Sequence, residues 1–88
     1  MADAFFPLEL VTPAAGVQRL NCECLTVTLC DGEAAFLKNH APFLGALPAG
    51  VIHVRYGENV DRWEIGEAFL QVSQKGAAIF TTKCEKQE

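Results

Sequence analysis

The apolar side chains between Val17 and Leu29 change phase, and this change limits the folds that the chain can adopt. They occupy even positions before the change and odd positions after it: Leu20, Cys22 and Cys24, then Leu25, Val27 and Leu29. Because successive side chains of a strand point to opposite faces of a sheet, one straight strand cannot bury both sets on the same side. The pattern therefore predicts a bulge, or a bend that carries the chain into a second sheet, near Cys24 and Leu25.

Short apolar runs separated by turn residues continue through the rest of the chain. Further strands are predicted at Phe6 to Thr12, Phe36 to Leu37, Val51 to Tyr56, Val60 to Ile65, Phe69 to Val72 and Ala77 to Thr82, and Pro42 to Pro48 is predicted as an apolar loop. Gly57-Glu58-Asn59 and Ser73-Gln74-Lys75-Gly76 are the expected hairpin turns, and no stretch has helical periodicity. We therefore predict an all-β fold, a two-sheet β-sandwich of about ten short strands or a small barrel.

Length and composition indicate one globular domain. Of the 88 residues, 50% are apolar and 20% are charged, which is a globular composition. A chain of this length can bury about 60 to 65% of its unfolded surface, which supports one modest core. The domain is expected to span residues 1–84, and the polar tail 85–88 is expected to fray from Lys83 onward. The uncharged stretch from Ala41 to Ile52 contains two prolines and two glycines, so it does not predict a transmembrane helix.

Charge and cysteine usage exclude further classes of protein. The net charge is −4, and the seven lysines and arginines are scattered, which argues against nucleic acid or an anionic membrane surface as a partner. The N-terminal segment Met1-Ala2-Asp3 contains an acidic residue instead of basic ones and does not resemble a signal peptide. The four cysteines are therefore expected to be reduced thiols in a cytoplasmic protein.

Several residues of chemically active types are present, but their spacing matches no known site. They are Cys22, Cys24, Cys30, Cys84, His40 and His53 for a metal or a thiol nucleophile, and Asp31 with Glu33 and Glu64 with Glu67 for a carboxylate pair. The cysteine pair lies closer together than in zinc knuckles and fits one core face of a strand. No glycine-rich elbow or phosphate loop accompanies the histidines, and the carboxylates fall at turns or strand ends. We expect no catalytic residue, no metal and no cofactor.

The segment from Gly32 to Pro42 resembles the epsilon subunit of F-type ATP synthases, whose N-terminal domain carries the run Gly-Glu-Phe-Gly-Val-Leu-Pro-Gly-His-Ala-Pro. The residues that match in register are Gly32, Glu33, Leu37, His40, Ala41 and Pro42, and similar blocks flank them at Leu8 to Pro13, Leu47 to Ile52 and Phe69 to Val72. The resemblance covers nearly the whole chain. The chain departs from the family at glycines replaced by Ala35, Asn39 and Ala68, where a positive φ would strain an alanine and the backbone is expected to differ.

The resemblance implies a non-catalytic subunit of the rotor central stalk. Such a subunit links gamma to the c-ring and couples proton or sodium translocation to ATP synthesis, on the cytoplasmic side of the bacterial inner membrane and without inserting into it. By resemblance, Gly32 and Glu33 would contact the c-ring, and His40, Ala41 and Pro42 would contact gamma. Because the chain ends after its last predicted strand, we also expect no C-terminal inhibitory helices.

The residues by themselves leave other interpretations open. His40 can be a turn histidine whose ring bonds a backbone group, or a surface residue, and Glu33 can be a solvated turn carboxylate. The apolar run from Pro42 to Leu47 fits either core packing or a docking face. The alternative functions are a free-standing β-sandwich binding module for a peptide or small ligand, and a thiol-dependent enzyme or zinc protein.

Overall fold

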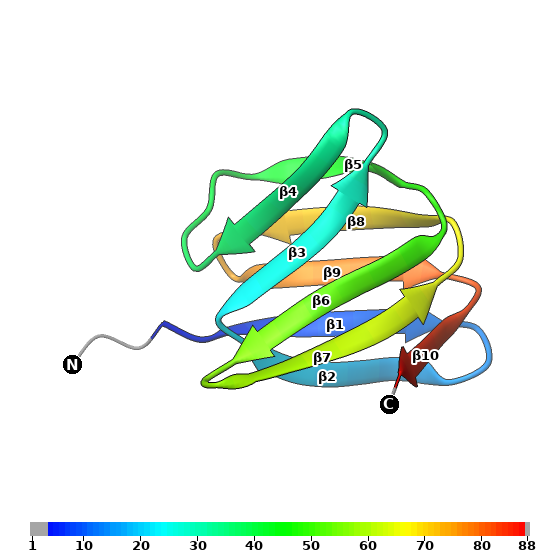
Figure 1. Ribbon diagram of the computed structural model, residues 1–88, viewed down its shortest axis with the longest axis horizontal. Helices are drawn as coiled ribbons and strands as arrows, with labels where there is room; N and C mark the ends of the chain where they lie inside the picture. Colours follow the sequence, from blue (N-terminus) through cyan, green and yellow to red (C-terminus); the bar gives the residue numbers. More distant parts are fainter. Residues whose placement is uncertain (1–3, 88) are drawn as a thin grey trace.

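Two five-stranded sheets face each other, and their strands cross obliquely (Figure 1). The structure, a computed structural model, describes residues 4–87. Within them the strands are β1 (Phe6–Thr12), β2 (Gly16–Cys22), β3 (Cys24–Leu29), β4 (Gly32–Leu37), β5 (Phe43–Leu47), β6 (Gly50–Tyr56), β7 (Asn59–Ile65), β8 (Ala68–Ser73), β9 (Gly76–Thr81) and β10 (Cys84–Gln87). Sheet A has the order β2-β1-β9-β8-β5 and sheet B the order β10-β7-β6-β3-β4. The predicted all-β sandwich is confirmed.

The chain crosses from sheet A to sheet B at Glu23, between β2 and β3. The Glu23 amide donates a hydrogen bond to the Arg55 carbonyl oxygen over 2.7 Å, and the Glu23 carboxylate accepts one from the Gly57 amide over 2.5 Å. This crossing confirms the predicted bend and explains the change of phase. Cys22 and Leu25 are both buried because each points inward from a different sheet.

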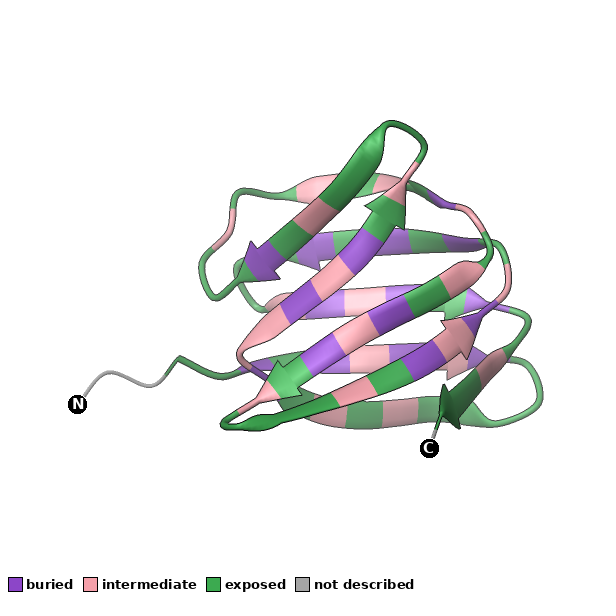
Figure 2. Cartoon of the chain, viewed as in Figure 1, coloured by how far each residue is buried: buried purple, intermediate pink, exposed green. Residues whose placement is uncertain are grey.

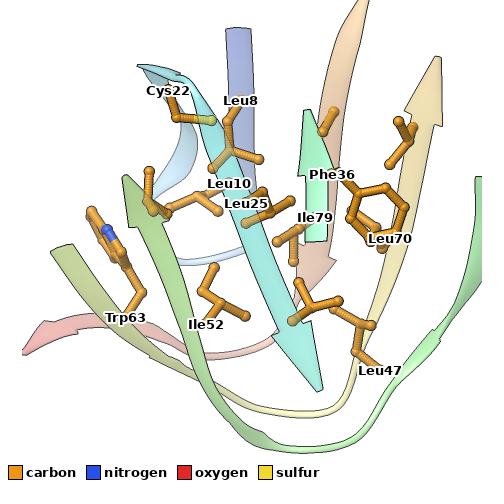
Figure 3. Close-up of a cluster of buried hydrophobic side chains, with 14 of the residues drawn as sticks. Leu8, Leu10, Cys22, Leu25, Phe36, Leu47, Ile52, Trp63, Leu70 and Ile79 are labelled. Atoms are coloured by element: carbon orange, nitrogen blue, oxygen red, sulfur yellow. The ribbon is translucent and has the colours of Figure 1, made fainter. Parts of the chain in front are cut away.

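The core lies between the two sheets, and buried residues alternate with more exposed ones along strands of both sheets (Figure 2). The fully buried side chains are Phe36, Leu8, Leu10, Leu25, Ile52, Leu70, Ile79, Val27, Val54 and Cys22. Figure 3 shows these side chains converging from the two layers, with Trp63 at one side of the cluster and Phe36 near Leu70 at the other. Each large side chain contributes about 1.5–3 kcal/mol by leaving water. The sandwich thus has one continuous core.

The prediction of a loop from Pro42 to Pro48 is wrong for most of this segment. Phe43–Leu47 form β5, an edge strand that pairs antiparallel with β8. The two prolines lie just outside the strand, where their missing N–H groups remove no bond from the ladder. Leu47 is buried while Leu44 is 73% exposed, which is the alternation of a half-buried strand.

The expected frayed tail is also wrong for Cys84–Gln87, which pair with β7 as β10 at the edge of sheet B. The Lys86 ammonium lies 3.4 Å from the Asp61 carboxylate, which ties the polar strand to its neighbour. Residue 88 of the predicted tail lies outside the described residues, as do residues 1–3. The predicted short strand Phe36 to Leu37 begins earlier, at Gly32.

Candidate interaction surfaces

His40 lies in the turn that connects β4 to β5 and carries the chain from sheet B to sheet A. The His40 amide donates to the Leu37 carbonyl oxygen over 3.1 Å. The His40 Nδ1 donates to the Ala41 carbonyl oxygen over 2.7 Å, since a carbonyl can only accept. The ring meets Phe36 edge-on with 4.6 Å between centroids. His40 therefore stabilises the turn in which it lies and packs against the core residue Phe36. This confirms the interpretation of His40 as a turn histidine whose ring bonds a backbone group.

The turn before His40 contains a positive φ at Asn39, where the resembling family has a glycine. Asn39 has a φ of 66° and is the only non-glycine residue with a positive φ in residues 4–87. Asparagine tolerates this left-handed conformation better than other side chains do, so it can replace the family's glycine here. Ala35 and Ala68 lie within strands without a positive φ, and neither is strained.

Gly32 and Glu33 begin β4 at the opposite end of that strand from the His40 turn. Gly32 has a φ of 137°, as the Asp31-Gly32 turn signal predicts, and both residues are exposed. The structure therefore separates the two groups of predicted contact residues by the length of β4 (Figure 1). They can face two different partners.

The cysteines are not brought together as a metal or thiol site. Residues 4–87 contain no group of three or more His, Cys, Asp or Glu side chains arranged to hold a metal ion. Burial, with a smaller contribution from neighbouring Cys24, raises the pKa of the Cys22 thiol to about 12. Burial also raises the pKa of the Cys84 thiol. Both thiols therefore stay protonated at neutral pH, which is the reverse of what nucleophilic catalysis requires.

Two further candidate side chains, Glu64 and His53, lie on the outer face of sheet B. Glu64 lies 3.8 Å from the Lys83 ammonium and accepts a hydrogen bond from the Gln87 amide over 3.5 Å. His53 lies on the outer face of sheet B opposite Arg62. Residues 4–87 include no helix with the length and apolarity needed to cross a bilayer.

The outer face of sheet A is a surface that sequence reasoning missed. Its residues Val17, Val11, Phe80, Phe69 and Ala46 stand opposite one another in register across all five strands. Phe69 is 58% exposed and Phe80 is 43% exposed. A groove of about 860 Å³ begins beside them and runs over the end of the sandwich toward Pro13, Pro48 and Cys30. The sequence predicts the alternation of inward-facing and outward-facing side chains within each strand. It does not predict which strands are neighbours in the sheet.

The two-layer sandwich carries an exposed apolar row on the outer face of sheet A, and the Gly32 hairpin and the His40 turn lie at the two ends of β4. Its exposed features are a flat sheet face, a hairpin tip and a tight turn, all of which suit contact with other proteins. The chain belongs to the family described as "ATP synthase, Delta/Epsilon chain, beta-sandwich domain", which matches residues 5–87. The predicted resemblance is thereby confirmed.

Curated relatives carry the same family name over a longer chain. The ATP synthase epsilon chain of Syntrophomonas wolfei is 33% identical over 86 residues, which cover 97% of this chain and 63% of the relative. The epsilon chain of Levilactobacillus brevis is 29% identical over 90 residues, covering 100% of this chain and 65% of the relative. A sodium-ion-specific epsilon chain from Propionigenium modestum is 26% identical over 76 residues, covering 86% and 56%. The chain thus spans less than two thirds of the length of these relatives.

Solved structures show the same fold. A chain in the Euglena gracilis mitochondrial ATP synthase, in an assembly of OSCP, F1 and c-ring, superposes with a TM-score of 0.86 at 22% identity, covering 98% of this chain and 56% of that one. A chain in the central stalk and c-ring of the Tetrahymena thermophila enzyme gives a TM-score of 0.74 at 16% identity, covering 90% and 64%.

Proposed function

We propose that this chain is the β-sandwich domain of a central-stalk subunit of an F-type ATP synthase. It links gamma to the c-ring, so that rotation driven by proton or sodium translocation is passed on to ATP synthesis. The observation that carries the proposal is the family match over residues 5–87, together with relatives that are epsilon chains. In this role the domain makes and breaks no covalent bonds, and it lies peripherally on the cytoplasmic side of the bacterial inner membrane.

A β-sandwich is mechanically suited to this task. A part that transmits torque must not deform between the element that turns it and the element that it turns. Two sheets packed through one continuous core have interior density and low compressibility. The Glu23 hydrogen bonds to Arg55 and Gly57 brace the crossing between the sheets, so twisting one sheet against the other strains this link.

The contact residues are proposed by resemblance to the epsilon family, and they lie at the two ends of β4. Gly32 and Glu33, on the exposed hairpin, would meet the c-ring, and His40, Ala41 and Pro42, in the turn at the far end, would meet gamma. Their separation by a whole strand supports two simultaneous contacts.

Reconstitution tests the proposal. The chain is mixed with purified gamma and with detergent-solubilised c-ring from the organism that encodes it, and Glu33→Ala and His40→Ala are compared one at a time. We expect Glu33→Ala to weaken retention on the c-ring by about tenfold without changing gamma binding, and His40→Ala to do the reverse. Failure of the unmodified chain to bind either partner would contradict the proposal and favour a free-standing module whose ligand occupies the apolar groove.

A further inference from the structure

We propose that the outer face of sheet B carries a binding site for a single phosphate group, held by His53, Arg55 and Arg62. We name these three side chains the sheet B cluster. The inference goes beyond the proposed function and does not depend on it. The ligand is a tetrahedral oxyanion, either free inorganic phosphate or the phosphate group of a nucleotide.

Strand register brings the sheet B cluster together. β6 and β7 are neighbours in sheet B (Figure 1), and His53 stands directly opposite Arg62. The residues next to them in the sequence, Val54 and Trp63, are buried in the core, so the cluster faces outward. Directly opposite side chains have Cβ atoms about 4.5–5.5 Å apart, and diagonal ones such as Arg55 and Arg62 about 7–8 Å apart. Both arginine side chains can therefore reach one ligand above His53.

The sheet B cluster has hydrogen-bond donors that the rest of the described chain does not use. Within residues 4–87 the exposed Arg62 side chain makes no hydrogen bond and no ion pair, and the His53 ring has no partner either. The Arg55 guanidinium lies 3.8 Å from the Glu23 carboxylate, which is longer than a hydrogen bond. A histidine donates at least one ring N–H in either protonation state. Donors from three side chains are thus available to a ligand.

Other cationic side chains on the two sheets supply the contrast. The Arg19 guanidinium donates a hydrogen bond to the Glu9 carboxylate over 3.0 Å. The Lys86 ammonium lies 3.4 Å from the Asp61 carboxylate. Among the three arginines of the chain, Arg62 is the one without an ion pair within residues 4–87. Its charge is therefore left for an anion from outside the chain.

The immediate neighbours of the sheet B cluster suit an oxyanion. In the register, Thr26 stands opposite His53, and Cys24 and Val60 stand opposite Arg55, so no carboxylate separates the two arginines. The Thr26 hydroxyl adds one more donor. A guanidinium presents its N–H groups in a planar fork that matches two oxygen atoms of a phosphate. A bound phosphate also removes the repulsion between the two arginines.

The net charge of −4 does not prevent binding of one anion here. On the same face of β7, the Glu64 carboxylate lies 3.8 Å from the Lys83 ammonium, which offsets its charge. Charges more than about 8 Å apart are largely screened at an ionic strength of about 0.15 M. Nucleic acid and anionic membranes need many clustered cations, whereas a single phosphate group needs only the few that are present.

The test is a titration of the unmodified chain with sodium phosphate at constant ionic strength, followed by two-dimensional ¹H–¹⁵N NMR. We expect saturable shifts at amides of β6 and β7, with a dissociation constant of about 1–10 mM. Arg62→Gln should weaken binding about tenfold and His53→Gln about threefold. The matched control is Arg19→Gln on the outer face of sheet A, where the arginine side chain is 77% exposed. We expect that variant to bind phosphate within about twofold of the unmodified chain.

Sulfate has the same shape and should bind within about threefold of phosphate, while chloride at equal ionic strength should cause no saturable shift. Displacement of phosphate by ADP assigns the phosphate group to a nucleotide, and lack of displacement assigns it to free phosphate; both support the site. Equal shifts with chloride, or unchanged phosphate binding by Arg62→Gln and His53→Gln, overturn the inference. Far-ultraviolet circular dichroism confirms that the variants are folded. Binding to gamma and the c-ring is measured separately, so failure here leaves the proposed function standing.

Discussion

Gly76 shows how one residue can depend on a neighbour that is distant in the sequence. It closes the β8–β9 turn with a φ of 146°, and a Cβ atom there would overlap the carbonyl oxygen and ring of Pro7. The turn itself was predicted from Ser73-Gln74-Lys75-Gly76. The close approach of β1 was not predictable, because it arises from the parallel pairing of β1 with β9.

We predict that Gly76→Ala lowers the free energy of unfolding by about 2–4 kcal/mol, through backbone strain and through the clash with Pro7. Urea denaturation measures the change. The matched control is Gly50→Ala, because no atom lies near its added Cβ and its φ is ordinary. We expect that control to stay within about 0.5 kcal/mol of the unmodified chain. Equal effects at the two positions would show that the approach of Pro7 is unimportant.

The burial of the Cys22 thiol leads us to predict that the free energy of unfolding depends on pH. Its folded pKa, about 12, lies above the ordinary value of 9.0, so the folded state favours the protonated thiol. Its contribution is fully present below pH 9 and is lost as the pH rises toward 12. We therefore expect the stability advantage of the unmodified chain over Cys22→Ala, measured by urea denaturation, to shrink steadily above pH 9.

The control for this titration is Val27→Ala, because Val27 is buried but carries no titratable group. The difference between that variant and the unmodified chain should not change between pH 7 and pH 11. A constant difference for Cys22→Ala as well would mean that the thiol is not buried in solution.

At the scale of elements, the hairpins were the easiest structures to predict. The β6–β7 and β8–β9 pairs have alternating side chains and glycine-containing turns, which are local signals. Edge strands β5 and β10 were missed because their neighbouring prolines or polar side chains resemble those of loops. An edge strand tolerates both, since only one side of it pairs.

We predict that β10 protects Trp63. Lys86 stands opposite Trp63, and Cys84 packs against the core. Deleting residues 84–88 should lower the free energy of unfolding by about 1–2 kcal/mol and shift tryptophan emission to longer wavelength. The chain has a single tryptophan, so the signal is unambiguous.

Lys86→Gln is the control for this deletion, since it removes only the half-exposed ion pair with Asp61. We expect a change within about 0.5 kcal/mol and unchanged emission. An unshifted spectrum after the deletion would indicate that β10 does not cover the ring.

At the scale of the whole molecule, β1 connects distant parts of the chain. It pairs antiparallel with β2 and parallel with β9 near the other end of the sequence. We therefore predict a single cooperative unfolding transition, with coincident urea curves from Trp63 fluorescence and far-ultraviolet circular dichroism, and folding in milliseconds to seconds. Separate curves for the two probes would show that the sheets unfold independently.

The sequence by itself determined the all-β class, a bulge or a crossing between sheets near Cys24, the main hairpins and the resemblance to the family. Each of these follows from side-chain alternation, turn residues or a short motif, all of which are local along the chain. Only the tertiary structure decided which outward-facing residues lie together. Val11, Phe69 and Phe80 form one apolar row because β1, β8 and β9 are neighbours in sheet A, and the order of strands depends on long-range pairing that local periodicity does not encode.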